Sequence, residues 1–478
     1  MIDSLDQYIN ALDYDPRLLL SLPPVGSTES IPAPHQRNSQ GNGVVICTLT
    51  PASESRDLND IVILNPGAGV IFPGALVLAN QSLAQGTPTP IALPRSPMTI
   101  SIDLPGLADR RTIQGTGTQE KSTISNSDVQ LAINQLLEIW NQNPRSQGYT
   151  NVSSSQATVQ KAYSSEQIAL ALGFTGKWAA GNAAMNLNVS SNSTSSSTTA
   201  FYKQVYYTVI MDTPPSPGSV FGSSVKPEHL MNSRIDKDNP PAYVRSVSYG
   251  RLVMITMTTN YSETEANLEG AMQQAVTAST TIGASLDAKY KKIIENSTFS
   301  VVTLGGNPNN TAGITSTLNG LDALPRLSEV IKNGAAYSRE NPGTPIAYTV
   351  AFLKDNRIAT ISASTRYIKQ ECISYPNGFV RIAHSGGYVA RFSVTWKEPD
   401  SQGAYVVSKR WDSGNQTAGY SQTISLPGDA RDIVIRGEAA TGLVWSPWGE
   451  IMNVQLGGPD NKTYTAKGTT LNRSYAVS

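Results

Sequence analysis

The sequence predicts a mixed α+β protein of several domains that ends in a β-sandwich. The chain has 478 residues, which is well above the usual size of one domain. Strand-like and helix-like patterns both occur in its first third. The C-terminal part carries several short alternating strands separated by Gly, Pro, Asn and Asp, and this spacing is typical of a small β-sandwich.

Two strands and one helix can be predicted in the first third of the chain. Residues 44–49 and 61–64 are rich in β-branched side chains and lie between turn residues, so both stretches predict strands. Residues 127–137 begin at Ser127, a residue type that caps helices, and repeat apolar side chains at a spacing of three and four. This stretch predicts a helix.

Two later stretches alternate apolar with small or polar side chains, which is the period of a β-strand. Each leg has about the 9–11 residues that cross a bilayer as a tilted strand, so the stretches predict two amphipathic β-hairpins. The alternative is a sheet edge with a surface helix and a flexible loop over residues 190–199. The predicted lipid-facing side chains are Ile168, Leu170, Leu172, Phe174, Met185, Leu187 and Val189 in the first stretch, and Val276, Ile282 and Leu286 in the second.

The same stretches also favour helices, since residues 268–275 are rich in helix-forming side chains. We therefore expect helical clusters that convert to β-hairpins, because a switch requires such a conflict between propensity and period. A single hairpin in hydrocarbon leaves unpaired backbone groups, each costing several kcal/mol. A closed barrel of several chains satisfies these groups, so this interpretation requires a homo-oligomer.

Composition argues against several classes of function. The 36 basic and 36 acidic side chains cancel, so net charge indicates neither nucleic acid nor an acidic membrane as a partner. No run reaches the ~18 apolar residues of a spanning helix, and the acidic first residues do not form a signal peptide. The three histidines, His35, His229 and His384, lack metal-ligand spacing. We expect no catalytic residue, no metal and no cofactor.

A segment near the C-terminus carries two tryptophans close together. Its residues are Thr441, Gly442, Leu443, Val444, Trp445, Ser446, Pro447 and Trp448. Glycine and proline keep the segment out of regular structure, so we expect a loop whose indoles favour the headgroup level of a membrane. The alternative is a buried tryptophan pair at the edge of the sandwich.

This tryptophan-rich segment and nine others resemble, in sequence and in order, those of the cholesterol-dependent (thiol-activated) cytolysins. The other segments are residues 72–76, 102–107, 202–204, 206–209, 304–306, 352–356, 384–386, 388–390 and 468–471. One short motif arises by chance, whereas a collinear set over most of the chain does not. The resemblance implies an elongated molecule with a twisted sheet core.

The resemblance further implies four domains. Domain 1 is discontinuous and comprises residues 4–20, 66–155, 206–255 and 333–357. Domain 2 is an elongated β domain of residues 21–65 and 358–376. Domain 3, residues 156–205 and 256–332, contains the two convertible stretches, and residues 377–478 form the sandwich as domain 4. Cys47 and Cys372 both fall in domain 2; a bridge is possible there, but we expect two buried free thiols, since two cysteines make no disulfide framework.

Several site residues are implied by the resemblance alone. Thr470 and Leu471 match the family's cholesterol-recognition pair, in which a hydroxyl meets the sterol 3β-hydroxyl and a leucine packs on the rings. Gly387 and Ala418 fall in two further membrane-touching loops. Gly305 and Gly306 match a glycine hinge that lets a covering strand bend away, and Phe299 matches an aromatic residue at the subunit contact.

The chain also departs from the family pattern. Ala440 replaces the cysteine behind the name thiol-activated, so we expect no need for reducing conditions. Gly449 stands where the family has an arginine, and Ala439, Ser446 and Pro447 replace two glutamates and a tryptophan. Ala157 and Val159 stand where other members carry an aromatic and an acidic residue that set strand register between subunits.

The resemblance implies a pore-forming cytolysin that is secreted or otherwise released, binds cholesterol in target membranes, oligomerises and inserts a large β-barrel. A protein receptor is neither indicated nor excluded. A rival interpretation is a sterol- or surface-binding relative that no longer forms pores. A lipid hydrolase is disfavoured because the sequence shows no catalytic cluster.

Overall fold

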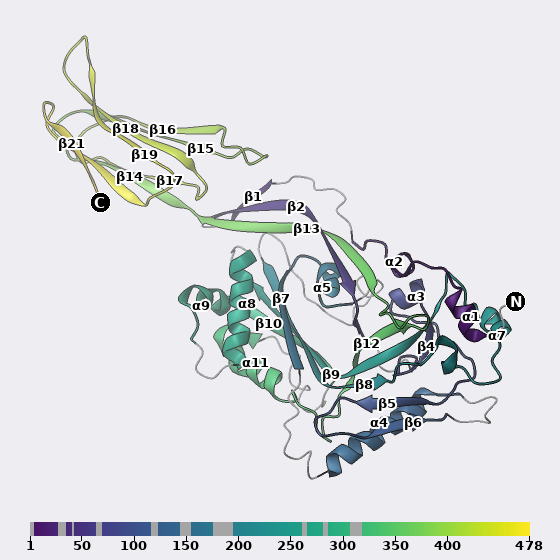
Figure 1. Ribbon diagram of the computed structural model, residues 1–478. Coiled ribbons are helices and arrows are strands. Elements are labelled where there is room, and N and C mark those ends of the chain that lie inside the picture. Colours follow the sequence, from purple (N-terminus) through teal and green to yellow (C-terminus); the bar gives the residue numbers. More distant parts are fainter. Residues whose placement is uncertain are drawn as a thin grey trace.

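The computed structural model describes residues 4–26, 35–40, 43–63, 69–115, 123–143, 154–174, 195–260, 265–280, 285–305 and 318–478. The molecule is elongated, with a large α+β body at one end, a thin neck and a sandwich that carries the C-terminus at the other end (Figure 1). This architecture confirms the predicted mixed, elongated fold with a C-terminal β-sandwich.

The body is built on one large sheet. Its two longest strands, β8 (Ser196–Met211) and β9 (Pro241–Thr259), pair antiparallel along most of their length. Both strands are buried almost throughout, as expected for a sheet that is covered on both faces. The other strands of this sheet are β3 (Ile61–Val62), β4 (Leu76–Leu78), β5 (Met98–Ile102), β6 (Arg110–Ile113), β7 (Ser154–Ala162), β10 (Ser297–Leu304), β11 (Leu318–Asn319) and β12 (Thr344–Phe352).

Helices cover opposite faces of this sheet. On one face, α8 (Glu265–Thr280), α9 (Ala288–Glu295) and α11 (Ala323–Lys332) pack on alternate residues of β9, including Val253 and Ile255. On the other face, α5 (Ser165–Ala171) packs on Leu252, Met254 and Phe201. The two stretches predicted to convert therefore lie on opposite faces of the same strands, and in this state their described parts are mainly helical.

One large hydrophobic core fills the rest of the body. It contains α4 (Asn126–Gln142), which begins earlier than the sequence predicted. Ser125, not Ser127, caps it, because the Ser125 hydroxyl accepts from the Asp128 N–H while the Asp128 carboxylate accepts from the Ser125 N–H. The smaller helices of the described residues are α1 (Leu5–Asn10), α2 (Pro16–Leu19), α3 (Gln81–Ala84) and α7 (Pro227–Asn232), together with the 3₁₀ turns η3 (Pro217–Val220) and η4 (Gly320–Asp322).

The neck is a narrow sheet in the order β1-β2-β13, formed by β1 (His35–Gln40), β2 (Gly43–Leu58) and β13 (Ile361–Pro376). β2 and β13 pair without interruption from Leu58 opposite Ile361 to Gly43 opposite Pro376. This register places Cys47 directly opposite Cys372, and the two form a disulfide. The expectation of two free thiols is therefore wrong, because strand pairing brings together cysteines that are 325 residues apart.

The sandwich consists of two four-stranded sheets packed around a common core. One sheet has the order β17-β14-β20-β21, and the other β16-β15-β18-β19. The strands are β14 (Gly378–His384), β15 (Ala390–Glu398), β16 (Val407–Gln416), β17 (Ser421–Leu426), β18 (Arg431–Ala440), β19 (Trp448–Leu456), β20 (Lys462–Gly468) and β21 (Arg473–Val477).

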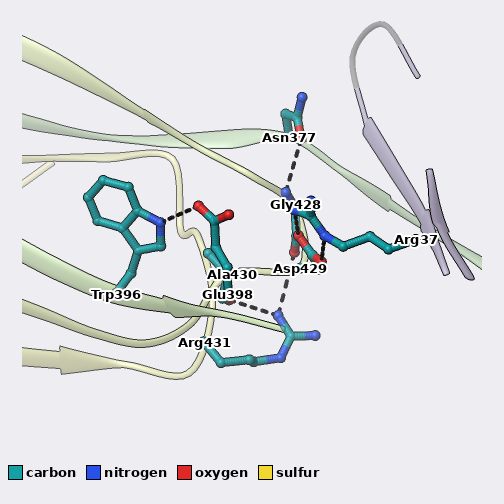
Figure 2. Close-up of polar contacts among 8 residues, drawn as sticks. All are labelled: Arg37, Asn377, Trp396, Glu398, Gly428, Asp429, Ala430 and Arg431. Carbon is teal, nitrogen blue, oxygen red and sulfur yellow. Dashed lines mark hydrogen bonds and ion pairs between the residues drawn. The ribbon is translucent and has the colours of Figure 1, made fainter. Parts of the chain in front are cut away.

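A buried ion pair fastens the sandwich to the neck (Figure 2). Arg37 of β1 donates two hydrogen bonds to Asp429, from Nε to Oδ2 at 2.6 Å and from Nη2 to Oδ1 at 2.9 Å. The Asp429 side chain is fully buried, whereas 28% of the Arg37 side chain is exposed. These hydrogen bonds raise the pKa of Arg37 against the opposing effect of burial. Beside the pair, the Asn377 amide oxygen accepts from the Gly428 N–H at 3.0 Å, so the joint is held by several contacts.

Candidate functional site

Four loops gather at the end of the sandwich that lies farthest from the neck. β14, β16, β18 and β20 all begin near the neck and run outward, so the loops that follow them meet at the same end. These loops are residues 385–389, 417–420, 441–447 and 469–472. We call this end of the sandwich the tip, the 441–447 loop the Trp loop and the 469–472 loop the Thr–Leu loop.

Backbone hydrogen bonds join these loops through residues 384–389. The Gly387 N–H donates to the carbonyl of Gly468 at 2.9 Å, and the Ala440 N–H donates to the carbonyl of Val389 at 2.8 Å. The Gly419 N–H donates to the carbonyl of His384 at 2.8 Å. Each bond joins one of these loops to the last residue of a strand that leads into another, so the tip is one structural unit.

His384 occupies the centre of this unit. Its ring is buried, with Nε2 2.8 Å from the carbonyl oxygen of Tyr388 and Nδ1 accepting from the Gly386 N–H at 3.3 Å. The ring packs against Tyr388 and Phe392, at centroid distances of 4.9 Å and 5.8 Å. Both ring nitrogens therefore form hydrogen bonds with the backbone of the 385–389 loop.

The tip exposes a group of large apolar side chains. Leu471 is 98% exposed, Val444 91%, Trp445 82% and Leu443 44%. Val389 in the neighbouring loop is 38% exposed and is not among the predicted site residues. Contiguous apolar side chains on one end of a domain mark a surface for a membrane or a partner.

The two tryptophans are placed differently. Trp445 projects from the Trp loop, which turns at Gly442, where φ is +80°, and is closed by a hydrogen bond from the Thr441 N–H to the carbonyl of Pro447 at 2.9 Å. Trp448 is instead the first residue of β19 and is half-buried beneath the Arg391 guanidinium, 4.2 Å from the ring centroid. The expectation that both indoles project from the loop is therefore wrong for Trp448. The alternative of a buried tryptophan pair is wrong as well, because Trp445 is exposed.

The cholesterol-recognition pair predicted from the sequence lies at the same end. Thr470 is half-buried and Leu471 is exposed in the Thr–Leu loop. Gly387 and Ala418 are also exposed, and Gly387 forms a bridge with Thr469. The tip thus brings together the Trp loop, the Thr–Leu pair and both additional loops that the sequence analysis named.

The residues predicted to face lipid lie in the body. Ile168, Leu170, Leu172 and Phe174 are buried in and just after α5, and Val276 is buried in α8. Leu286 is partly buried just before α9. Met185, Leu187, Val189 and Ile282 lie outside the described residues.

The predicted hinge and subunit contact lie at one edge of the large sheet. Gly305 follows β10 with φ +81°, a conformation that suits glycine, and Gly306 lies outside the described residues. Phe299 is fully buried on β10 and pairs with Leu318 of β11. In the described part of the chain, β11 pairs with β10 through two residues, so it covers a short part of that edge.

The described residues contain no candidate metal centre. No group of three or more His, Cys, Asp or Glu side chains in that part of the chain is placed to hold a metal ion. No described helix is long and apolar enough to cross a membrane.

Comparison with known proteins agrees with this architecture along the whole chain. The profile of the thiol-activated cytolysins matches residues 4–375, and that of the thiol-activated cytolysin β-sandwich domain matches residues 379–474. Listeriolysin O from Listeria monocytogenes is 33% identical over 100% of this chain and 88% of its own length. Tetanolysin from Clostridium tetani is 34% identical over 98% of this chain and 86% of its own length.

Solved structures give the same result. The crystal structure of listeriolysin O superposes with a TM-score of 0.82 at 30% identity and covers 99% of this chain and 95% of that one. A disulfide-locked mutant of intermedilysin with human CD59 superposes with a TM-score of 0.76 at 30% identity, covering 99% and 98%. The match to these cytolysins places the chain among the pore-forming toxins rather than the enzymes. The chain belongs to the thiol-activated, or cholesterol-dependent, cytolysin family.

Proposed function

We propose that this protein binds cholesterol-containing membranes through the tip of its sandwich, assembles into a ring and inserts β-hairpins as a large barrel pore. The observation that carries the proposal is the tip itself. Four hydrogen-bonded loops present Leu471, Val444 and Trp445 almost fully exposed beside Thr470. The action on other cells' membranes implies a released toxin, and the four-domain division predicted from the sequence is part of this proposal.

The chemistry of the tip suits a sterol in a bilayer. The Thr470 hydroxyl is available at headgroup level for the sterol 3β-hydroxyl, and Leu471 reaches deeper to pack on the rings. Moving one leucine or tryptophan side chain from water into the interface supplies roughly 1.5–3 kcal/mol. This corresponds to about ten- to a hundredfold in membrane affinity per side chain.

The pore-forming step is assigned to the stretches around α5 and α8. They lie on opposite faces of β8, β9 and β10, so both must leave those faces before they can extend the same strands into hairpins. Sheet edges are available for assembly at β7, and at β10 once β11 moves away at Gly305. We assign the subunit contact to these two edges, with Phe299 near it.

Dye release from liposomes and binding to them test this proposal. The protein is expected to release dye from phosphatidylcholine liposomes that contain cholesterol and not from liposomes without it. Thr470→Gly combined with Leu471→Gly is expected to abolish binding while leaving the thermal unfolding curve unchanged, since exposed loop residues contribute little stability. If the double variant binds as well as the parent, the sterol site lies elsewhere.

Two neighbouring substitutions test the barrel. A charge on the lipid face costs about 2–4 kcal/mol at the bilayer midplane, and every subunit of a ring repeats that cost. Leu187→Lys is therefore expected to stop leakage without preventing binding, whereas Asn188→Lys points into the lumen and is tolerated. Equal leakage from both folded, membrane-bound variants would remove this stretch from the pore.

The second candidate function is a binding protein that no longer forms pores. Position 449 is glycine, and Ala157 and Val159 stand on β7, the sheet edge assigned above to assembly. The fold alone does not decide between the candidates, because a non-hemolytic pneumolysin from Streptococcus pneumoniae superposes with a TM-score of 0.82 at 28% identity. Cholesterol-dependent binding without dye release would favour this second candidate.

A further inference from the structure

Arg473 contacts the backbone at the base of the Trp loop from the opposite sheet. It is the first residue of β21 and follows the Thr–Leu loop directly. A Cβ atom built on Gly449 would lie 2.7 Å from Cζ, Nη1 and Nη2 of Arg473. Equal distances to three atoms mean that the face of the guanidinium lies over Gly449. A glycine at position 449 thus leaves room for this approach.

This contact joins two loops that no shared sheet connects. Gly449 is the second residue of β19 and follows the Trp loop, whereas Arg473 belongs to the sheet that contains β20 and β21. The backbone hydrogen bonds described above link the two loops through residues 385–389. The Arg473 guanidinium adds a direct contact between their bases.

The 385–389 loop also lies near Arg473. Burial raises the pKa of Tyr388, and the nearby positive charge of Arg473 opposes this rise. Tyr388 is 8% exposed and donates its hydroxyl to the carbonyl of Lys467 at 3.0 Å. Next to Gly449, Arg391 stacks on the Trp448 ring. The guanidiniums of Arg391 and Arg473 therefore pack on Trp448 and Gly449, the first two residues of β19.

We propose that Arg473 is a positioning residue that couples the Trp loop to the Thr–Leu loop, so that both meet the membrane in one fixed arrangement. This inference rests on the proposed membrane-binding function of the tip. Coupling raises affinity because the second loop engages at a high effective concentration once the first is bound. A preformed arrangement also lowers the entropy lost on binding.

A double-mutant cycle on this contact tests the inference. Arg473→Ala removes the guanidinium, and Gly449→Ala keeps it but places a methyl group in the space that it occupies. Each is expected to weaken binding to cholesterol-containing phosphatidylcholine vesicles about tenfold, and the double variant is expected to bind as the single variants do. All three are expected to show a smaller change of tryptophan emission at saturating vesicle concentration than the parent.

Matched controls separate coupling from general damage. Gly457→Ala adds a methyl group in open space just beyond the other end of β19, and Arg436→Ala removes an exposed arginine of β18. Both are expected to bind as the parent does. Circular dichroism and thermal unfolding monitor the fold; if Arg473→Ala does not fold, Arg473→Met fills the space without the planar charge and replaces it in the cycle.

The outcomes are distinct. Parental affinity in both single variants overturns the inference, as does a double variant about a hundredfold weaker than the parent, because independent effects multiply. Either result leaves the proposed function intact, provided that the parent binds and the Thr470→Gly, Leu471→Gly variant does not. A parent that fails to bind cholesterol vesicles overturns the proposed function itself.

Discussion

Removal of Arg37 is expected to destabilise the sandwich and its joint with the neck. Arg37→Ala leaves the fully buried carboxylate of Asp429 without its partner. Loss of one partner of a buried pair costs about 3–5 kcal/mol. Arg37 lines a cavity of about 530 Å³ between the neck and residues 399–405, so water can reach the vacated space. We therefore expect the low end, about 3 kcal/mol.

Tryptophan fluorescence is a suitable assay for this effect. Trp396 and Trp411 pack against the sandwich core, so their emission follows unfolding of that domain in urea. For a domain of about a hundred residues, 3 kcal/mol lowers the melting temperature by roughly 10 °C or more. The expected result is a lower urea midpoint and a lower melting temperature for unfolding of the sandwich, with little change in either value for the body.

An exposed pair in the same domain provides the control. Arg410 donates to Asp412 through the same two atoms, Nε at 2.6 Å and Nη2 at 2.8 Å, yet both side chains are more than half exposed. Arg410→Ala is expected to leave the midpoint unchanged, since exposed pairs contribute little. Equal effects of Arg37→Ala and Arg410→Ala would refute the reasoning, because burial is the main difference between the two pairs.

Three further predictions concern the tip, the neck and the body. Trp445→Ala is expected to lower membrane affinity at least tenfold without changing stability, whereas Trp448→Ala also lowers the melting temperature because it removes the Arg391 stack; equal stability of both variants would contradict this. Cys47→Ser is expected to cost roughly 2–4 kcal/mol by opening the neck disulfide, so reductant should lower the melting temperature rather than activate lysis. Burial raises the pKa of Tyr249 to about 12 despite its hydrogen bond with Gln130. The contribution of the neutral phenol to the free energy of unfolding is therefore present below pH 10 and is lost as the pH rises to 12. Tyr249→Phe should flatten the pH dependence of the free energy of unfolding in that window.

The fold was predictable from the sequence where local pattern decides it. The alternating strands of the sandwich and the helix around residues 127–137 follow from periodicity and capping. The disulfide was not predictable, because it depends on the register of β2 against β13, which places Cys47 opposite Cys372. Register is set by the pairing of the two strands as a whole, and no local signal in either strand reveals it.

The tip was predictable only in part, for the same reason. The Gly- and Pro-containing segment indicated an exposed Trp445 as a local feature, whereas Leu471 was implied by the family resemblance alone. The stack of Arg391 on Trp448 and the contact of Arg473 with Gly449 join strands that are distant in sequence. In the sequence, Gly449 is a departure from the family pattern. In the structure, its missing side chain leaves room for the guanidinium of Arg473 from another strand.

Helix α8 carries two apolar patterns, one after the other along its length. Leu268, Ala271, Met272 and Ala275 are fully buried against the sheet at helical spacing, while the two-residue alternation begins at Val276. Two of these fully buried residues are alanines, which bury less apolar area than leucines, so their contacts contribute less free energy. The Ser279 hydroxyl also donates to the carbonyl of Leu324 in α11 at 3.2 Å, so a polar contact joins α8 to a neighbouring helix. This packing supports the proposal that α8 leaves the sheet during pore formation, after which the alternation from Val276 onward would give it one apolar face as a strand.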